Sequence, residues 1–297
     1  MKLLTHYLNA QNVQKPEDRN WRENYINDSL FYSSRATHYT RQTYPSSLHY
    51  HEYYELVIFL EGDIHYICES ESFHPQYGDI ILIPPRKLHM SMIDGEETLY
   101  RRHVFYLYPD AFDALGCGAL SGFLTEEHLL TALGERDRYQ LISLLSRLEV
   151  TLRMESSCAQ ALALGYILEI FYLLNQERTQ QKRPEASLPE NVRAIQQYLN
   201  EHFMEIRNVS EVAEHFYYSR EYVSRLFKQA FNTTVADYIM TRRVAYSQSL
   251  IAQGLPLSDI CYKAGFGNLT TFIRSFHTVA HMTPSQYRKT LEKQELS

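Results

Sequence analysis

The spacing of hydrophobic residues changes along the chain, from short runs typical of strands to the longer period of helices. A run rich in aromatic and β-branched residues, 49–60, stops at the turn signal Glu61-Gly62-Asp63, and 64–68 is predicted as its hairpin return. Residues 80–83 form a further short buried strand that Pro84 ends, because proline cannot donate to a strand ladder. Many short strands between about residues 30 and 110 predict a closed sandwich or barrel.

From about residue 135 the apolar residues recur at helical spacing. Leucines three and four positions apart over 141–152, and a second such set over 164–174, predict a helical hairpin. The segment 176–189 has almost no apolar residue and contains two prolines, so it is predicted to be a linker. We therefore expect domains at 1–175 and 190–297, joined by 176–189.

Everything after the linker has helical periodicity, and it contains an internal repeat. The segment 209–213 returns at 257–261, 48 residues later, and 225–228 returns at 274–277, 49 residues later. Each copy predicts a short helix, a tight turn and a second helix, which is a helix-turn-helix unit. One longer helix over about 235–250 would join the two copies, and the capping box at 283–286 predicts a last helix.

The composition agrees with a two-domain globular protein. The chain has 297 residues, of which 44% are hydrophobic and 22% are charged, so disordered and fibrous classes are excluded. No apolar run approaches the roughly 20 residues of a membrane helix, and no signal peptide is apparent, so we expect a cytoplasmic protein without a membrane partner. Four cysteines lie far apart without a CxxC pair, which fits neither a disulfide framework nor a zinc finger.

The charge is unevenly distributed. Residues 189–297 carry 12 Lys and Arg against 10 Asp and Glu, a net of +2, whereas residues 1–188 carry 17 against 25, a net of −8. The acidic first part will not attract nucleic acid by itself, but the mildly basic second part can bind it if its charges share one face.

Three motifs in the last hundred residues are specific. They are Ser219-Arg-Glu-Tyr-Val-Ser-Arg-Leu-Phe-Lys228, then Ala264-Gly-Phe266 followed by 272–276, and Met282-Thr-Pro-Ser-Gln-Tyr-Arg288. Together they resemble the DNA-binding domain of the AraC/XylS family of transcription regulators. Tyr217 departs from the family pattern, because this turn usually carries glycine, as the second copy does at Gly265. A left-handed tyrosine would cost roughly 1–2 kcal/mol there, so the first turn could be reshaped.

The resemblance implies two recognition helices about 34 Å apart, which would enter successive major grooves of promoter DNA. The candidate DNA-binding residues lie on one face of each helix: Arg220, Glu221, Ser224, Arg225 and Lys228 on the first, and Asn268, Thr270, Thr271, Arg274 and His277 on the second. The alternative is that these are ordinary solvated faces. We expect Arg225 and Arg274 to contact bases and Lys228 to contact phosphate, whereas for Glu221 and His277 both interpretations stay open.

The first part of the chain resembles the cupin-like sensor domain of many family members. His49-x-His51-x₃-Glu55-x₆-Gly62 follows the first cupin motif, and Gly78-x₅-Pro84 with His89 follows the second, although Arg86 and Ile93 depart from it. Three imidazoles and a carboxylate would suit a divalent ion of Fe, Mn, Ni or Zn. The alternative is that His49, His51, Glu55 and His89 bind a small effector directly.

These expectations combine into an α and β protein of several domains, with a cupin-like β-barrel and helical hairpin followed by an all-α domain. We expect a transcription regulator, an activator by the family's usual mode, that responds to a small metabolite. The many tyrosines of the first part could stack on a sugar, although most are expected to be structural. The expected partners are promoter DNA, RNA polymerase and a second copy bound through the first domain. The rival hypothesis is a cupin metalloenzyme, an isomerase or dioxygenase, with a helical tail for oligomerisation.

Overall fold

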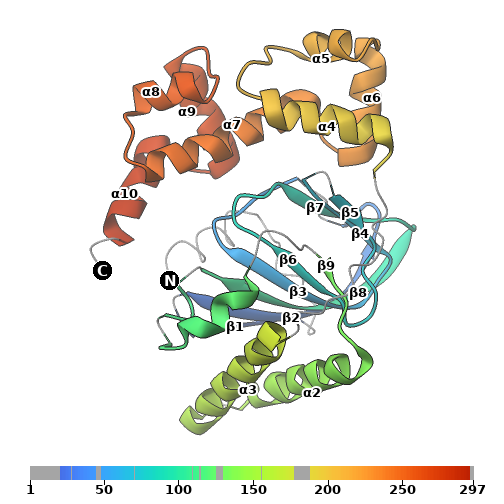
Figure 1. Ribbon diagram of the computed structural model, residues 1–297, viewed down its shortest axis with the longest axis vertical. Helices are drawn as coiled ribbons and strands as arrows, with labels where there is room; N and C mark the ends of the chain where they lie inside the picture. The colour runs from blue at the N-terminus through green and yellow to red at the C-terminus, as the bar shows by residue number, and fades with distance from the viewer. Residues whose placement is uncertain are drawn as a thin grey trace. The chain divides into compact units, whose positions relative to one another are not determined.

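A computed structural model describes residues 21–27, 29–44, 48–69, 71–108, 110–113, 115–124, 130–154, 156–176 and 188–294. Contacts divide the chain into two compact units, of which the first holds all the strands with α2 and α3, and the second holds α4 to α10 (Figure 1). Most of the predicted linker lies outside the described residues.

The first unit contains two antiparallel sheets. The larger has the strand order β1-β2-β8-β3-β6-β9 and the smaller has the order β5-β4-β7. The larger sheet is formed by β1 (Trp21–Asn27), β2 (Leu30–Thr40), β3 (Tyr54–Glu61), β6 (Ile80–Ile83), β8 (Glu97–Leu107) and β9 (Leu130–Thr131). The smaller is formed by β4 (Ile64–Cys68), β5 (Glu71–Phe73) and β7 (His89–Ile93).

The predicted hairpin return at 64–68 is wrong in its pairing. β4 has the predicted bounds, but it pairs with β5 and β7, whereas β3 pairs with β6 and β8. Gly62, at φ 140°, therefore directs the chain from one sheet to the other. The strand predicted from residue 49 begins only at Tyr54, because residues 50–53 are not in a ladder.

Two helices cover one face of the larger sheet. α2 (Glu135–Thr151) and α3 (Ser157–Gln176) form the predicted hairpin, and the short 3₁₀ helix η1 (Gly118–Phe123) precedes them (Figure 1). Leu56 and Ile58 of β3 pack with Leu145, Ile167 and other residues of these helices in one core. Because side chains alternate along a strand, Glu55, Val57 and Phe59 belong to the opposite, inner face of this sheet.

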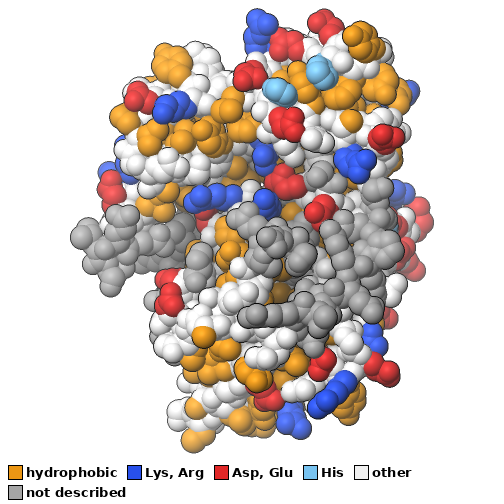
Figure 2. All heavy atoms as spheres, viewed as in Figure 1, with side chains coloured by type: hydrophobic (Ala, Val, Ile, Leu, Met, Phe, Trp, Pro, Cys, Tyr) orange, Lys and Arg blue, Asp and Glu red, His pale blue; other side chains and the backbone are white. Residues whose placement is uncertain are grey.

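The outer surface of this helix pair stays partly apolar. Hydrophobic side chains are visible on the part of the first unit that α2 and α3 form (Figure 2). The large exposed residues on the two helices and their connection are Tyr139, Val150, Met154, Leu162 and Tyr172. Of the helices in the described residues, α3 is long and apolar enough to cross a membrane by length and composition, while its Ile167, Ile170 and Phe171 lie in the core.

The second unit is entirely helical in its described residues. Its elements are α4 (Glu190–His202), α5 (Val209–His215), α6 (Arg220–Phe231), α7 (Val235–Ala252), α8 (Leu257–Lys263), α9 (Leu269–Ala280) and α10 (Pro284–Gln294). The capping box is present, since Thr283 N–H donates to Gln286 Oε1 at 2.8 Å and Gln286 N–H donates to Thr283 Oγ1 at 3.2 Å. The predicted fold class, a cupin-like β domain followed by a helical domain, is confirmed.

The internal repeat appears as two helix pairs with the same turn. In the first copy Tyr217 N–H donates to Glu214 O and Tyr218 N–H to Ala213 O, and the same two bonds recur 48 residues later at Gly265 and Phe266. Tyr217 is left-handed at φ 56° and Gly265 at φ 80°. The first turn is thus not reshaped by its tyrosine, and it keeps the geometry of the glycine turn.

One helix joins the two copies, as predicted. Tyr238 near the start of α7 packs against Phe227 and Phe231 of α6, with ring centroids 5.2 and 6.1 Å apart. Val244, Leu250 and Ile251 in its second half lie in a core with residues of α8 and α9. Because one continuous helix contributes to both cores, the two helix-turn-helix units have a fixed mutual arrangement.

Candidate functional sites

The predicted DNA-contacting face of α6 is solvent-exposed. Val223 and Phe227, one turn apart, are buried at 0% and 1% exposure and fix which side of the helix faces the core. All five predicted residues are exposed on the remaining surface: Arg220, Glu221, Ser224, Arg225 and Lys228. The Lys228 ammonium donates to the carbonyl of Asn232 at 2.8 Å, at the end of the helix.

The equivalent face of α9 is arranged in the same way. Phe272 and Phe276 are both fully buried, and Asn268, Thr270, Arg274 and His277 are exposed, whereas Thr271 is half-buried. Asn268 also caps the helix, because its side-chain oxygen accepts from Thr271 N–H at 2.8 Å. Its part in DNA contact stays a prediction, as do those of the other nine residues.

Arg225 and Arg274 occupy equivalent places in the repeat. Each precedes by two residues the phenylalanine that anchors its helix, and both are exposed. The Arg225 guanidinium lies 5.8 Å from the centroid of the Tyr222 ring, near enough for a weak cation–π contact. An exposed guanidinium on such a helix is free to meet the two acceptors of a guanine edge.

The turns contribute exposed residues that the sequence interpretation did not select. Tyr217 is 96% exposed and Tyr218 is 38% exposed in the first turn, directly before α6. The missing glycine at residue 217 was the available signal. A tyrosine in a strained position without packing contacts has no structural benefit, so its side chain is a further candidate for DNA contact.

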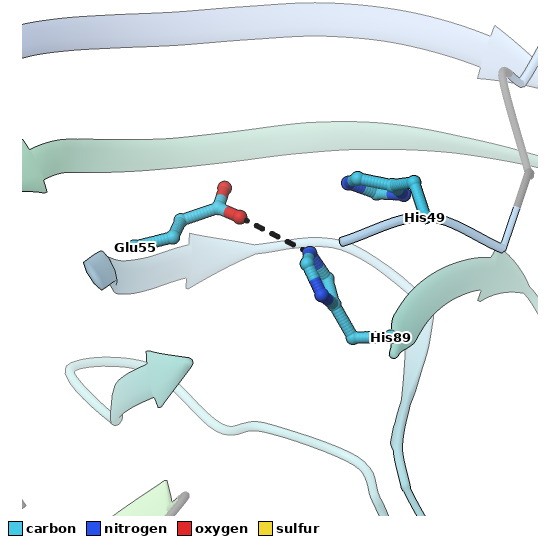
Figure 3. Close-up of side chains that lie close together, drawn as sticks. All are labelled: His49, Glu55 and His89. Atoms are coloured by element: carbon cyan, nitrogen blue, oxygen red, sulfur yellow. Dashed lines mark ion pairs between the residues drawn. The ribbon is translucent and has the colours of Figure 1, made fainter. Parts of the chain in front are cut away.

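The predicted sensor residues converge at the inner face of the barrel. Figure 3 shows His49, Glu55 and His89 directed toward one another, and their ligand atoms lie within 4.8 Å of each other. Glu55 Oε2 is 3.2 Å from His51 Nε2 and 3.4 Å from His89 Nε2. His51 reaches Glu55 although residues 50–53 are not in a ladder, because the chain bends before β3 begins.

The hydrogen bonds of the two buried imidazoles determine which nitrogen faces the carboxylate. His51 Nδ1 lies 2.7 Å from Tyr53 O, and His89 Nδ1 lies 2.9 Å from Lys87 O. A carbonyl only accepts, so both Nδ1 atoms carry hydrogen and both Nε2 atoms point at Glu55. Burial by itself raises the pKa of Glu55, but hydrogen bonds from His51 and His89 outweigh it and hold the pKa well below its usual range.

This arrangement fits a divalent metal ion. Metal-binding histidines commonly donate their second nitrogen to a carbonyl while the first binds the ion, as His51 and His89 would here. When His51 and His89 are neutral, each Nε2 presents a lone pair toward the carboxylate instead of donating to it, and a cation between them would remove that repulsion. A proton on each imidazole, or a hydroxyl of an effector, would remove it equally well. The donor set therefore fits both of the alternatives left open by the sequence.

A second group of metal-ligand type was not predicted. His65 of β4, His74 after β5 and Asp94 after β7 have ligand atoms within 4.8 Å of one another. His74 Nε2 and Asp94 Oδ2 form an ion pair at 2.5 Å. The pairing of β4 with β5 and β7 brings these residues together, and no local pattern along the chain indicates that pairing.

Two family profiles match this chain. The AraC-like ligand binding domain matches residues 33–167, and a helix-turn-helix domain matches residues 212–290. The chain belongs to the AraC/XylS family of transcription regulators. Its two units are thus the ligand-binding domain and the DNA-binding domain of an AraC-family regulator.

Similar proteins are transcription regulators by name. An uncharacterized HTH-type transcriptional regulator of Staphylococcus aureus is 24% identical over 77% of this chain, and the match covers 30% of that protein. The chain thus spans about a third of the length of these staphylococcal relatives. The HTH-type regulator YbfI of Bacillus subtilis is 25% identical over 76% of this chain and 80% of its own length.

Solved structures of related domains match as well. The C-terminal domain of AraT from Geobacillus stearothermophilus is 27% identical and covers 35% of this chain and 87% of its own, with a TM-score of 0.34. ToxT from Vibrio cholerae is 14% identical and covers 92% of this chain and 99% of its own, with a TM-score of 0.35.

Proposed function

We propose that this AraC-family regulator activates transcription by reading promoter DNA with α6 and α9 together, under control of a small metabolite bound in the barrel. The observation that carries the proposal is the doubled helix-turn-helix with exposed arginines at equivalent positions, Arg225 and Arg274. A single chain with two such helices joined by α7 would read an asymmetric site of two successive major grooves.

Selection from randomised DNA tests this reading of the helices. If each arginine makes a bidentate base contact, Arg225→Ala or Arg274→Ala relaxes the preference at one base pair and costs about 1–3 kcal/mol. The two affected positions should lie one helical turn apart, about 10–10.5 base pairs. Arg193→Ala, an exposed arginine of α4, serves as the matched control and should leave the preference unchanged. Loss at the same base pair for both variants would contradict the proposal.

The sensor proposal assigns effector contact to His49, His51, Glu55 and His89. A carbohydrate is the effector class that the surrounding tyrosines favour, because sugar rings stack on aromatic faces while hydroxyls bond to imidazole and carboxylate. His51→Ala or Glu55→Ala should abolish the response to effector and leave basal DNA binding nearly intact. Equal induction of the variant and the parent protein would place effector binding elsewhere.

The outer surface of α2 and α3 supports a homodimer. Tyr139 is 79% exposed, Tyr172 56% and Leu162 48%, which is a large apolar area to leave in water. A dimer formed there would present four recognition helices to repeated half-sites, and a bound dimer could contact RNA polymerase. Leu162→Glu should shift the protein to monomer in sedimentation, whereas Arg147→Gln, at an exposed position of α2, should not.

The rival function is metal-dependent catalysis in the barrel. The convergence of His49, Glu55 and His89 favours it, because three ligands leave coordination positions open. Metal analysis of the purified protein beside a DNA shift assay separates the two functions, with His74→Gln included to account for metal at the second group. Bound metal and substrate turnover without sequence-specific DNA binding would favour the enzyme.

A further inference from the structure

Two arginines face each other across neighbouring strands inside the barrel. Arg102 of β8 pairs directly with Arg35 of β2 in the antiparallel register. Phe105 and Leu107 of β8 belong to the core shared with α2 and α3, so by alternation Tyr100, Arg102 and Val104 lie on the inner face. Directly opposite residues have Cβ atoms about 4.5–5.5 Å apart, so the two side chains leave the sheet beside each other. The Arg35 Nε donates to Ser33 Oγ at 3.0 Å.

The Arg102 guanidinium has an unsatisfied donor. Within the described part of the chain, its buried Nη1 has no hydrogen-bond partner, and no carboxylate forms an ion pair with it. Its neighbour Arg101 lies on the other face and pairs with Glu61 at 3.4 Å. Arg102 is half-buried as a whole. Removing a charged group from water without a counter-charge is costly, and a bound anion would offset that cost.

Tyrosines surround this guanidinium but supply no negative charge. The Arg102 Cζ lies 3.9 Å from the centroid of the Tyr100 ring. Tyr66 and Tyr100 are hydrogen-bonded through their hydroxyls, and the Tyr44 hydroxyl bonds to Ser91 Oγ at 2.5 Å. Burial raises the pKa of Tyr66 and of Tyr100, so both phenols stay neutral. The group formed by Arg102, Tyr44, Tyr66 and Tyr100, the Arg102 centre, is therefore cationic and partly aromatic.

The Arg102 centre shares the inner face with the predicted histidine site but lies farther along the sheet, although the Glu55 charge still acts on the Tyr100 hydroxyl. Arg102 lies opposite Phe59 of β3, four residues along the strand from Glu55, a separation of about 13 Å at the usual rise per residue. Glu55 is held by His51 and His89, so it does not neutralise Arg102. None of the sequence patterns selected this centre, because only the strand register shows that the two arginines meet.

We propose that the Arg102 centre binds the carboxylate of a small organic acid, and that the effector is a sugar acid rather than a neutral sugar. A guanidinium takes a carboxylate in two parallel hydrogen bonds, and Nη1 is available for one of them. The tyrosine rings beside it give a sugar ring apolar faces for stacking. This inference rests on the proposed sensor function and specifies the chemistry of its ligand.

The test uses matched pairs of neutral and acidic sugars: glucose with glucuronate, and galactose with galacturonate. Binding to the full chain is measured by calorimetry and by the shift in melting temperature. At least one acid should bind the parent protein and Arg101→Met, and its affinity for Arg102→Met should fall about 30-fold or more. The neutral partner should bind more weakly and should not distinguish the variants.

Folding of the variant is checked in the same experiment. Removing an uncompensated buried charge should leave the melting temperature of ligand-free Arg102→Met equal to or above that of the parent protein. The proposal is overturned if no acid binds the parent protein, if an acid binds Arg102→Met equally well, or if a neutral sugar binds as tightly as its acid.

Operator binding in the same samples separates this inference from the function on which it rests. If an acid binds through Arg102 but leaves affinity for a selected operator unchanged, the anion site stands and effector control fails. If a neutral sugar changes operator affinity in both the parent protein and Arg102→Met, effector control stands and the anion site fails.

Discussion

Tyr217 occupies a left-handed position that a glycine would occupy without strain. Its φ is 56° and its side chain is 96% exposed, so the substitution Tyr217→Gly removes strain and loses little packing. Left-handed backbone costs a non-glycine residue about 1–3 kcal/mol. The greater freedom of glycine in the unfolded chain offsets about 0.4–1 kcal/mol of that. The net expectation is a stabilisation of roughly 1 kcal/mol.

Hydrogen exchange of the α6 amides is the appropriate assay, because it reports opening of this unit separately from the barrel. If the α6 amides exchange through opening of this unit, a gain of roughly 1 kcal/mol in the free energy of opening slows their exchange about five-fold. Unchanged or faster exchange in Tyr217→Gly would refute the reasoning, since it would mean that the tyrosine is unstrained or that its ring contributes contacts.

The second copy supplies a matched comparison. A Cβ built on Gly265 would lie 2.2 Å from the Met204 carbonyl oxygen, whereas one built on Gly254, also at φ +80°, would meet nothing within 4 Å. Gly254→Ala should therefore show only backbone strain, about 1 kcal/mol, and Gly265→Ala should cost clearly more. Equal losses of stability in the two variants would indicate that the loop at Met204 moves away from the new Cβ without an energetic cost.

Two further predictions concern charge, and a third concerns the domain boundary. Burial lowers the pKa of His103 to about 4, from about 6.5 when unfolded, so the unfolded state binds more protons and stability falls by about 2 kcal/mol between pH 7 and pH 5. Chemical unfolding of His103→Gln should lose that part of the pH dependence, and the exposed His38→Gln should keep it. Lys228→Ala should weaken binding to all DNA sequences alike and lower the salt slope by about one, as measured by titration across salt concentrations. A fragment of residues 189–297 should fold and bind the operator by itself, and an unfolded fragment in circular dichroism would contradict the proposed boundary.

Local sequence signals determined much of this fold. The bounds of β4 and β6, the two leucine-rich helices and the repeat at 48 and 49 residues all follow from nearest-neighbour chemistry: turn residues, apolar period and caps. The exposed faces of α6 and α9 follow as well. Phe227 and Phe276 are buried and mark the side of each helix that faces the core, so the opposite side faces solvent. Their DNA contacts stay predictions.

What the sequence did not show depends on pairing between distant strands. From its local sequence Ile64–Cys68 is equally compatible with a hairpin to β3. Only the observed pairing with β5 and β7 shows that it belongs to the smaller sheet. The β4–β5 ladder brings His65 beside His74, and the β2–β8 ladder places Arg35 opposite Arg102. A lone arginine in a strand is normally a solvated residue, so its inward direction becomes informative only when the face of that strand is known.

The two copies of the repeat differ because the rest of the unit surrounds them differently. Arg243 of α7 donates from Nε to Phe203 O at 2.8 Å and from Nη2 to Ile206 O at 2.7 Å, which fixes the loop that follows α4. That loop carries the Met204 carbonyl to within 2.2 Å of where a Cβ of Gly265 would lie, so the second turn requires glycine. The first turn has no such neighbour among the described residues and faces solvent. Backbone strain is therefore the only cost of a side chain at residue 217. Packing against the second copy therefore explains why one turn keeps glycine and the other can carry an exposed tyrosine.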